Sequence, residues 1–200
     1  MKRPIVTLLS AATLLIFTAG CNSDDSVKQA QEANEMKADS TTANTDMGKV
    51  EEKGMDYDAE FLAKAASGGM LEVEMGKQVA ARAVTPQAKE FAQKMIDDHT
   101  KGNAELMALA TKKNITLPTT LGDDHAKVLK NVTEEKGIKM DQQYMKEMLE
   151  DHKEDVREYT EASIKAADPD VKAFAAKAVP MLKMHLDMVT KMKPTVDAAK

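Results

Sequence analysis

Apolar residues recur at intervals of three and four between Asp56 and Met192, and the alternating pattern of a β-strand does not persist anywhere in this stretch. This periodicity predicts four long amphipathic helices, with bounds close to 57–83, 85–113, 140–167 and 168–192. Thr85 and Asp168 each stand directly before a proline, an arrangement typical of a helix N-terminus. The pattern therefore predicts an all-α domain over residues 56–193, followed by a C-terminal tail over 194–200.

The connections between these helices predict how they are arranged. Only a few residues separate the first helix from the second and the third from the fourth, so each pair should form an antiparallel hairpin. About 25 residues separate the second helix from the third, and they include a short amphipathic segment near 123–135. A connection of this length lets the chain return along the domain. We therefore expect a four-helix bundle with one long crossover, in which the second and third helices run parallel.

The first twenty residues have the features of a secretion signal. Two basic residues precede an apolar stretch at 5–17, which is too short to cross a bilayer as a helix. The small residues at 18–20 then precede Cys21, the single cysteine of the chain. This arrangement resembles a bacterial lipobox, in which the cysteine becomes the lipidated N-terminus. The following Asn22 resembles an outer-membrane sorting signal, so we expect an outer-membrane lipoprotein whose bundle lies in the periplasm or at the cell surface. The alternative is an ordinary signal peptide with an incidental cysteine.

The segment between this signal and the bundle is polar. From Asn22 to Gly54 it has no aromatic residue and little aliphatic bulk. Such a composition buries too little apolar surface to offset the entropy lost on ordering. The sequence therefore predicts a disordered acidic tether over residues 21–55 that separates the membrane from the bundle.

Composition and charge exclude several functional classes. The chain has 28 basic and 33 acidic residues, a net charge of −5, which argues against a nucleic-acid-binding protein. One cysteine excludes an internal disulfide framework and every cysteine-rich metal motif. The sequence contains no phosphate-binding glycine loop, no G-x-S-x-G motif and no Cys–His pair. The remaining candidate chemistry lies in the polar residues on the apolar faces of the helices.

Each long predicted helix has one polar residue within its apolar stripe, and these four are Glu72, His99, His152 and His185. Counted from the hairpin loops, the four positions lie at one height of the bundle. Three imidazoles and a carboxylate suit a divalent transition metal such as Zn, Mn, Fe or Cu. The alternative is a hydrogen-bonded histidine–glutamate network that keeps the helices in register.

Other polar and sulfur-containing residues need separate interpretations. Asp98 and Asp151 precede two of the histidines and could accept hydrogen bonds from their ring N–H groups. The methionines of the last helix are expected to fill the core rather than to bind copper. We expect His125 to mark where the short crossover helix docks, without a chemical role, and Pro180 to bend the last helix.

Several motifs resemble the bacterial domain of unknown function 4142 over about 56–192. They are Gly68–Glu74, Met95–Lys101, Leu117–Pro118, Tyr144–Met145 with Asp151–His152, and Lys172–Leu186. That family is grouped with ferritin-like bundles and is often labelled as outer-membrane protein, so the resemblance implies a ferritin-like four-helix bundle and no established activity. Ferritin-like di-iron enzymes use Glu-x-x-His pairs. No such pair is present, because Ile96, Leu149 and Leu182 stand three residues before the histidines.

The sequence as a whole favours a non-catalytic, lipid-anchored envelope protein that binds a metal ion or a protein partner. The alternative is a mononuclear metalloenzyme for redox or oxidative-stress chemistry, with His99, His152, His185 and Glu72 around the metal. A catalytic metal would keep a coordination position open to substrate.

Overall fold

The computed structural model describes residues 25–41 and 46–200, and this part of the chain is helical without strands. The helices are α1 (Ser26–Thr41), α2 (Asp46–Arg82), α3 (Pro86–Lys113), α4 (Asp123–Thr133), α5 (Ile138–Lys165) and α6 (Pro169–Ala198). Among these helices, none combines the length and the apolar character needed to cross a membrane. The expected signal peptide, Cys21 and Asn22 lie outside the described residues.

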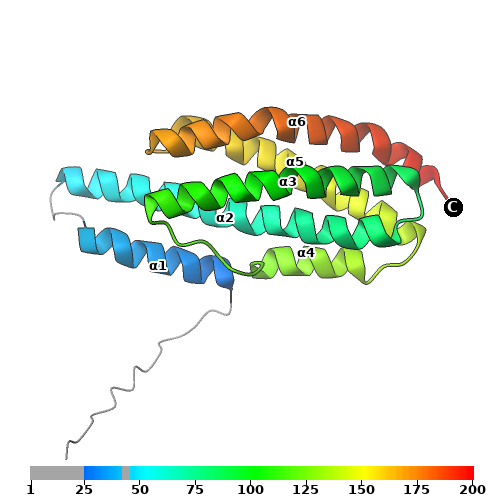
Figure 1. Cartoon of the computed structure of the whole chain (residues 1–200), viewed down its shortest axis with the longest axis horizontal. Coiled ribbons are helices and arrows are strands. Elements are labelled where there is room, and N and C mark those ends of the chain that lie inside the picture. Colours follow the sequence, from blue (N-terminus) through cyan, green and yellow to red (C-terminus); the bar gives the residue numbers. More distant parts are fainter. Residues whose placement is uncertain (1–24, 42–45) are drawn as a thin grey trace, which may run out of the picture.

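Four long helices form the bundle, and their directions agree with the sequence prediction. Helices α2 and α3 form one antiparallel hairpin, and α5 and α6 form the other (Figure 1). The long connection returns the chain along the bundle, so that α3 and α5 run parallel (Figure 1). The predicted all-α bundle with one long crossover is therefore confirmed.

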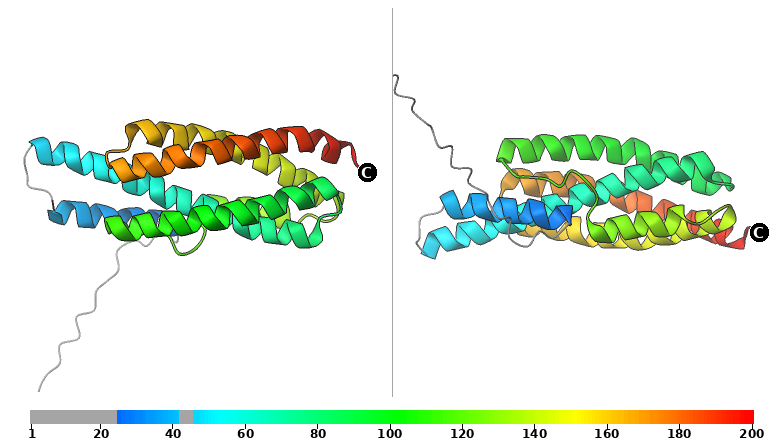
Figure 2. Two further views of the ribbon diagram at one scale, coloured as in Figure 1. Left: turned by 45° about the horizontal axis from the view of Figure 1, so that its top comes forward. Right: turned by 90° about the horizontal axis from the view of Figure 1, so that it is seen from below.

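Helices α1 and α4 add an outer layer to this bundle. They lie nearly end to end along α2, and α4 also packs against α5 (Figures 1 and 2). The prediction of a disordered tether over 21–55 is wrong for residues 26–41, because α1 docks through polar contacts that composition does not show. Asn34 exchanges two hydrogen bonds with the Thr116 backbone, at 2.7 and 2.9 Å, and Ser26 donates to the Thr120 carbonyl.

Two predicted helix boundaries also need correction. Helix α2 begins at Asp46 rather than near Tyr57, and a Cβ at Gly54 would lie 2.7 Å from the Ala167 side chain, so α2 passes close to the α5–α6 turn. Helix α6 continues through both Pro180 and Pro194 to Ala198, so residues 194–198 are not a tail. Val196 is fully buried, and the Gln142 side chain donates to its carbonyl, which holds this last turn on the bundle.

Each hairpin turn is held by a buried aspartate from the opposite hairpin. Asp141 of α5 accepts hydrogen bonds from the Val84 and Thr85 backbone N–H groups and from the Thr85 hydroxyl. Asp58 of α2 accepts from the N–H groups of Ala167 and Asp168 at 2.9 and 2.7 Å. Helix starts leave N–H groups without partners. These two carboxylates satisfy N–H groups at the turns and fix the height of one hairpin against the other.

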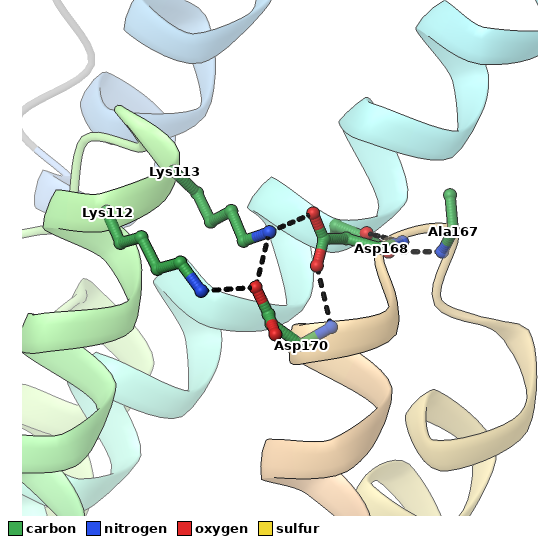
Figure 3. A network of polar contacts seen from close by, with 6 residues as sticks. Lys112, Lys113, Ala167, Asp168 and Asp170 are labelled. Atoms are coloured by element: carbon green, nitrogen blue, oxygen red, sulfur yellow. Dashed lines mark hydrogen bonds and ion pairs between the residues drawn. The ribbon is translucent and has the colours of Figure 1, made fainter.

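The α5–α6 turn is also tied to the end of α3 by ion pairs. Lys113 contacts both Asp168 and Asp170, and Lys112 contacts Asp170 at 2.8 Å (Figure 3). These two acidic residues belong to the start of α6, and Asp168 caps it by accepting from the Asp170 N–H. The predicted cap at this helix start is therefore present, as is the Thr85 cap of α3.

The hydrophobic core is divided into two clusters by a polar layer. One cluster is built around Phe91, Met95, Tyr144 and Met148, and the other around Phe61, Leu62, Leu106 and Ala162. Along α3 and α5, His99 and His152 stand between the members of the two clusters. The polar residues identified from the sequence are thus at the middle of the bundle.

We expect Asp141→Ala to lower the free energy of unfolding by about 1–3 kcal/mol, because it leaves buried N–H and hydroxyl donors without an acceptor. Urea unfolding followed by circular dichroism measures this change. Asp197→Ala on the exposed side of α6 is the control and should change stability by less than about 0.5 kcal/mol. Equal stability of the two variants would contradict the proposed role of the Asp141 carboxylate.

Candidate functional site

The four polar residues predicted to share one layer do meet in the structure. Glu72 comes from α2, His99 from α3, His152 from α5 and His185 from α6. Glu72 and His99 are 2% and 6% exposed, and the other two histidines are fully buried. The helix faces and heights expected from the sequence are therefore correct for all four.

The three histidine rings turn one nitrogen each toward a common point. His99 Nε2 and His152 Nε2 each lie 3.3 Å from His185 Nδ1. One ligand nitrogen of each ring lies within 4.8 Å of those of the other two rings. The rings meet edge to face or tilted, with centroids 5.2–5.8 Å apart. Three nitrogens so arranged can serve as ligands to one metal ion.

The other nitrogen of each ring faces a hydrogen-bond acceptor. His99 Nδ1 lies 2.5 Å from Glu72 Oε2, and His185 Nε2 lies 2.8 Å from Asp98 Oδ2. His152 Nδ1 lies 3.0 Å from the carbonyl oxygen of Met148. A carbonyl or carboxylate oxygen can only accept, so each of these outer nitrogens carries the ring proton. In neutral rings the three inner nitrogens are then left as unprotonated lone pairs.

Burial disfavours a positive charge on two of the three rings. It lowers the pKa of His185 to about 4, assisted by the neighbouring His99 and His152 and only partly opposed by the hydrogen bond to Asp98. Burial also lowers the pKa of His152, although the charge of Glu72 opposes it. Adding a proton at the inner nitrogens of His152 and His185 is thus disfavoured near neutral pH.

The two carboxylates that hold ring protons are themselves ionised. Burial alone raises the pKa of Glu72, but the three histidines outweigh it and lower the pKa below its usual value. Partial burial likewise raises the pKa of Asp98, and hydrogen bonds from Lys94 and His185 outweigh it. Both groups therefore carry a negative charge beside a histidine ring, which strengthens the ring as an electron-pair donor.

The structure assigns different positions to the two aspartates that were expected to hold ring N–H groups. Asp98 does accept from His185, as expected. Asp151 accepts from no histidine; its Oδ2 atom is buried, and burial together with the nearby Glu72 raises the pKa of this carboxyl well above its usual range. Asp151 instead lies in a second group of possible metal ligands with Glu72 and His152, whose donor atoms are within 4.8 Å of one another. Glu72 takes the ring-holding role expected of Asp151, and it does not belong to the group of the three histidines.

Two cavities lie near this layer, and of its four residues His99 lines the smaller one. The larger, about 510 Å³, is lined by Asp151 and by residues of α1, α2, α4 and α5. The smaller, about 230 Å³, is lined by His99 and Asp98 and passes beside Gly102. A Cβ at Gly102 would have nothing within 4 Å, so this glycine leaves open space next to the layer. Gly76 serves another purpose, because a Cβ there would lie 3.0 Å from the Ala92 carbonyl of α3.

One group of residues was missed by the sequence analysis. The lining of the larger cavity includes Glu147 and Asp155, which stand four residues before and after the already identified Asp151 on α5. Glu150, Glu154 and Glu158 form a second such row. The repeat of acidic residues at helical spacing was a visible signal. By contrast, His125 does mark the docking of α4, since its Nδ1 lies 2.6 Å from the Ser67 hydroxyl of α2.

Comparison with known structures shows the fold. A DUF305 protein from Streptomyces coelicolor, provisionally described as secreted, has a TM-score of 0.59 at 15% identity; the match covers 72% of this chain and 96% of that one. A DUF305 fragment from Deinococcus radiodurans also has a TM-score of 0.59, at 10% identity, with coverage of 72% and 97%. No curated protein sequence matches the chain.

The sequence comparison with protein families agrees with the resemblance seen in the motifs. The domain of unknown function DUF4142 matches residues 48–192. The matched range contains Glu72 and all three histidines of the buried layer. The chain belongs to the DUF4142 family.

Proposed function

We propose that this protein binds one divalent transition-metal ion in the core of its bundle, between His99 Nε2, His152 Nε2 and His185 Nδ1. One observation carries the proposal: the proton of each ring is held by an outer acceptor, so three lone pairs converge in a buried space. Lone pairs brought together without a proton repel one another. A cation between them removes this repulsion and takes three ligands at once.

The alternative of a purely structural hydrogen-bond network fits these contacts less well. Such a network needs a proton between each pair of rings. The three available protons are already directed outward, and burial opposes adding another to His152 or His185. At 3.3 Å, the inner nitrogens are also farther apart than in an ordinary hydrogen bond between nitrogens and oxygens. The contacts therefore favour a metal ligand set over a register-fixing network.

The separations suit tetrahedral coordination. With Zn–N bonds of about 2.0–2.1 Å, neighbouring ligand nitrogens of a tetrahedron are about 3.3 Å apart. Two of the three separations here have that value. Glu72 and Asp98 would orient His99 and His185 as carboxylates commonly orient metal-binding histidines. Neutral imidazoles suit Zn²⁺, Cu²⁺ and Fe²⁺, so the ligand set selects a class of metal rather than one element.

We further propose that the protein is an extracytoplasmic lipoprotein anchored in the outer membrane through Cys21. The basic residues, apolar stretch and small residues before this cysteine support the proposal. The provisional description of the Streptomyces DUF305 protein as secreted also supports a location outside the cytoplasm. The bundle would then hold its metal in the periplasm or at the cell surface, as a binding protein rather than an enzyme.

Metal analysis of protein purified without a His tag tests the core proposal. We expect about one equivalent of a divalent transition metal in the wild type, and its loss in His152→Ala, which removes an inner ligand. Asp97→Asn is the control, because this exposed aspartate lines neither cavity and accepts a hydrogen bond from Gln93, and it should keep the metal. Metal content that stays low in the wild type after incubation with Zn²⁺, or that is unchanged by His152→Ala, would contradict the proposal.

The second candidate, a mononuclear metalloenzyme, is favoured by the smaller cavity beside His99. If an exogenous ligand can reach the metal there, azide should change the visible spectrum of the Co²⁺-loaded protein, because a three-histidine site leaves a fourth position for it. Gly102→Leu fills the cavity and should suppress the change. A spectrum insensitive to azide in the wild type would favour the non-catalytic role.

Membrane attachment is tested by Cys21→Ala. Without the acylated cysteine, the protein should move from the membrane to the soluble fraction after cell breakage, because the chain has a net negative charge and no affinity of its own for anionic lipid. Immunoblots of the two fractions measure the change, with Ser23→Ala as control. A variant without Cys21 that stays in the membrane would overturn the lipid anchor.

A further inference from the structure

The larger cavity of about 510 Å³ is strongly acidic. It lies beside the first residues of α1 and of α4, and residues of α2 and α5 line its other walls. Nine of its lining residues are acidic and two are lysines. On α5, Glu147 and Asp155 stand one turn to either side of Asp151, and neither forms an ion pair with a described basic residue. Burial and the neighbouring acidic groups raise the pKa of both Asp151 and Asp155 well above the usual range, so the other acidic side chains supply the charge that concentrates cations, and a cation that binds Asp151 displaces its proton.

Two acidic side chains, Asp151 and Glu72, lie close together beside the cavity, and Asp151 is the one that lines it. The Oδ2 atom of Asp151 is buried. The Oε1 atom of Glu72, a side chain 98% buried, lies 3.4 Å from His152 Nε2. Asp151, Glu72 and His152 offer three donor atoms within 4.8 Å of one another. These atoms form a coordinating group that a cation in the cavity would meet before the histidines.

His152 is a member of both groups of possible ligands, and its Nε2 atom contacts members of both. This nitrogen lies 3.4 Å from Glu72 Oε1 on the side of Asp151 and 3.3 Å from His185 Nδ1 on the side of the other rings. A cation held by Asp151 and Glu72 could therefore move to the three histidines by a short shift while keeping His152 as a ligand. No step of this transfer requires the metal to lose all its protein ligands.

The smaller cavity lacks this character. Its charged lining residues are two acids, Asp98 and Glu105, and two lysines, Lys101 and Lys177. Glu105 is paired with Lys177 at 2.7 Å, and Asp98 is occupied by Lys94 and His185. It has no net charge to attract a cation, and both of its acidic side chains already have a partner.

We propose that the acidic cavity is the loading route of the metal, and that Asp151 is the positioning residue that passes the cation from the cavity to His152. This inference rests on the proposed metal-binding function. Because Asp151 would hold the ion only in transit, its carboxylate lowers the barrier between solvent and the histidines in both directions. The affinity of the final site then depends on the histidines and not on Asp151.

Stopped-flow kinetics with Co²⁺ tests the route, on a tag-free chain beginning at Asn22, which keeps every described residue. The ligand-field absorbance reports association, and release to an excess of chelator reports dissociation. We expect Asp151→Asn to slow both rates by roughly tenfold or more, with the dissociation constant changed by less than about threefold. Asp97→Asn, an exposed aspartate outside both cavities, is the matched control and should keep wild-type rates.

Two further variants separate the possible outcomes. Glu147→Gln with Asp155→Asn leaves Asp151 in place and should slow association at low salt, with recovery at high salt. Gly102→Leu, which fills the smaller cavity, should leave loading unchanged. Wild-type rates in Asp151→Asn, or slow loading in Gly102→Leu alone, would overturn the route. Faster release with unchanged association in Asp151→Asn would make Asp151 a ligand of the final site and also overturn it.

The outcomes for the route and for the metal site are distinguishable. If the wild type shows no Co²⁺ spectrum that depends on His152, the proposed metal-binding function fails and the route fails with it. If the wild type binds Co²⁺ through the histidines while Asp151→Asn keeps wild-type rates, only the route fails. If Asp151→Asn does not fold, the double variant decides between these cases.

Discussion

Three imidazoles and a carboxylate are buried at one level of the bundle. The need to give each of these polar groups a partner constrains how the four helices pack. Burying polar groups is unfavourable unless each finds a partner. Here every outer ring nitrogen has an acceptor: Glu72 for His99, Asp98 for His185 and the Met148 carbonyl for His152. The layer interrupts the hydrophobic core and leaves one cluster on each side of it. A shift of any of the four helices by one turn, about 5.4 Å, would move Glu72 or a histidine into one of these apolar clusters and separate it from its partner.

The turns supply the precision that this layer needs. Asp141 and Asp58 each satisfy the N–H groups of the opposite hairpin turn, and so they set the relative height of the two hairpins from both ends. A metal ligand set tolerates errors of only a few tenths of an ångström in position. The bundle therefore places its register-fixing contacts far from the layer and leaves the inner nitrogens free for a ligand. Binding of a metal there would add to stability, because only the folded chain assembles the three nitrogens.

The fold was largely readable because helical periodicity is a local property repeated over many turns. Each apolar stripe repeats over many helical turns, so many residues together set its position around the helix. A single exception such as Pro180 does not change that position. The length of the connection before α5 then determined the parallel arrangement of α3 and α5. Helix α1 was not predicted, because its order depends on a few long-range bonds, such as that between Asn34 and Thr116, rather than on apolar area. Residues 194–198 were assigned to a tail for the same reason, since the burial of Val196 depends on where α5 lies.

For the candidate site, the sequence by itself determined which four residues share the layer, because stripe position and distance from a hairpin loop locate a side chain along and around a helix. Only the tertiary structure decided what each polar group does. Asp98 and Asp151 occupy the same place relative to a following histidine, yet one holds a ring proton and the other faces an acidic cavity. Which ring nitrogen points inward depends on side-chain torsions and on acceptors from other helices. These are set by packing between segments far apart in the chain, and no periodicity along the sequence encodes them.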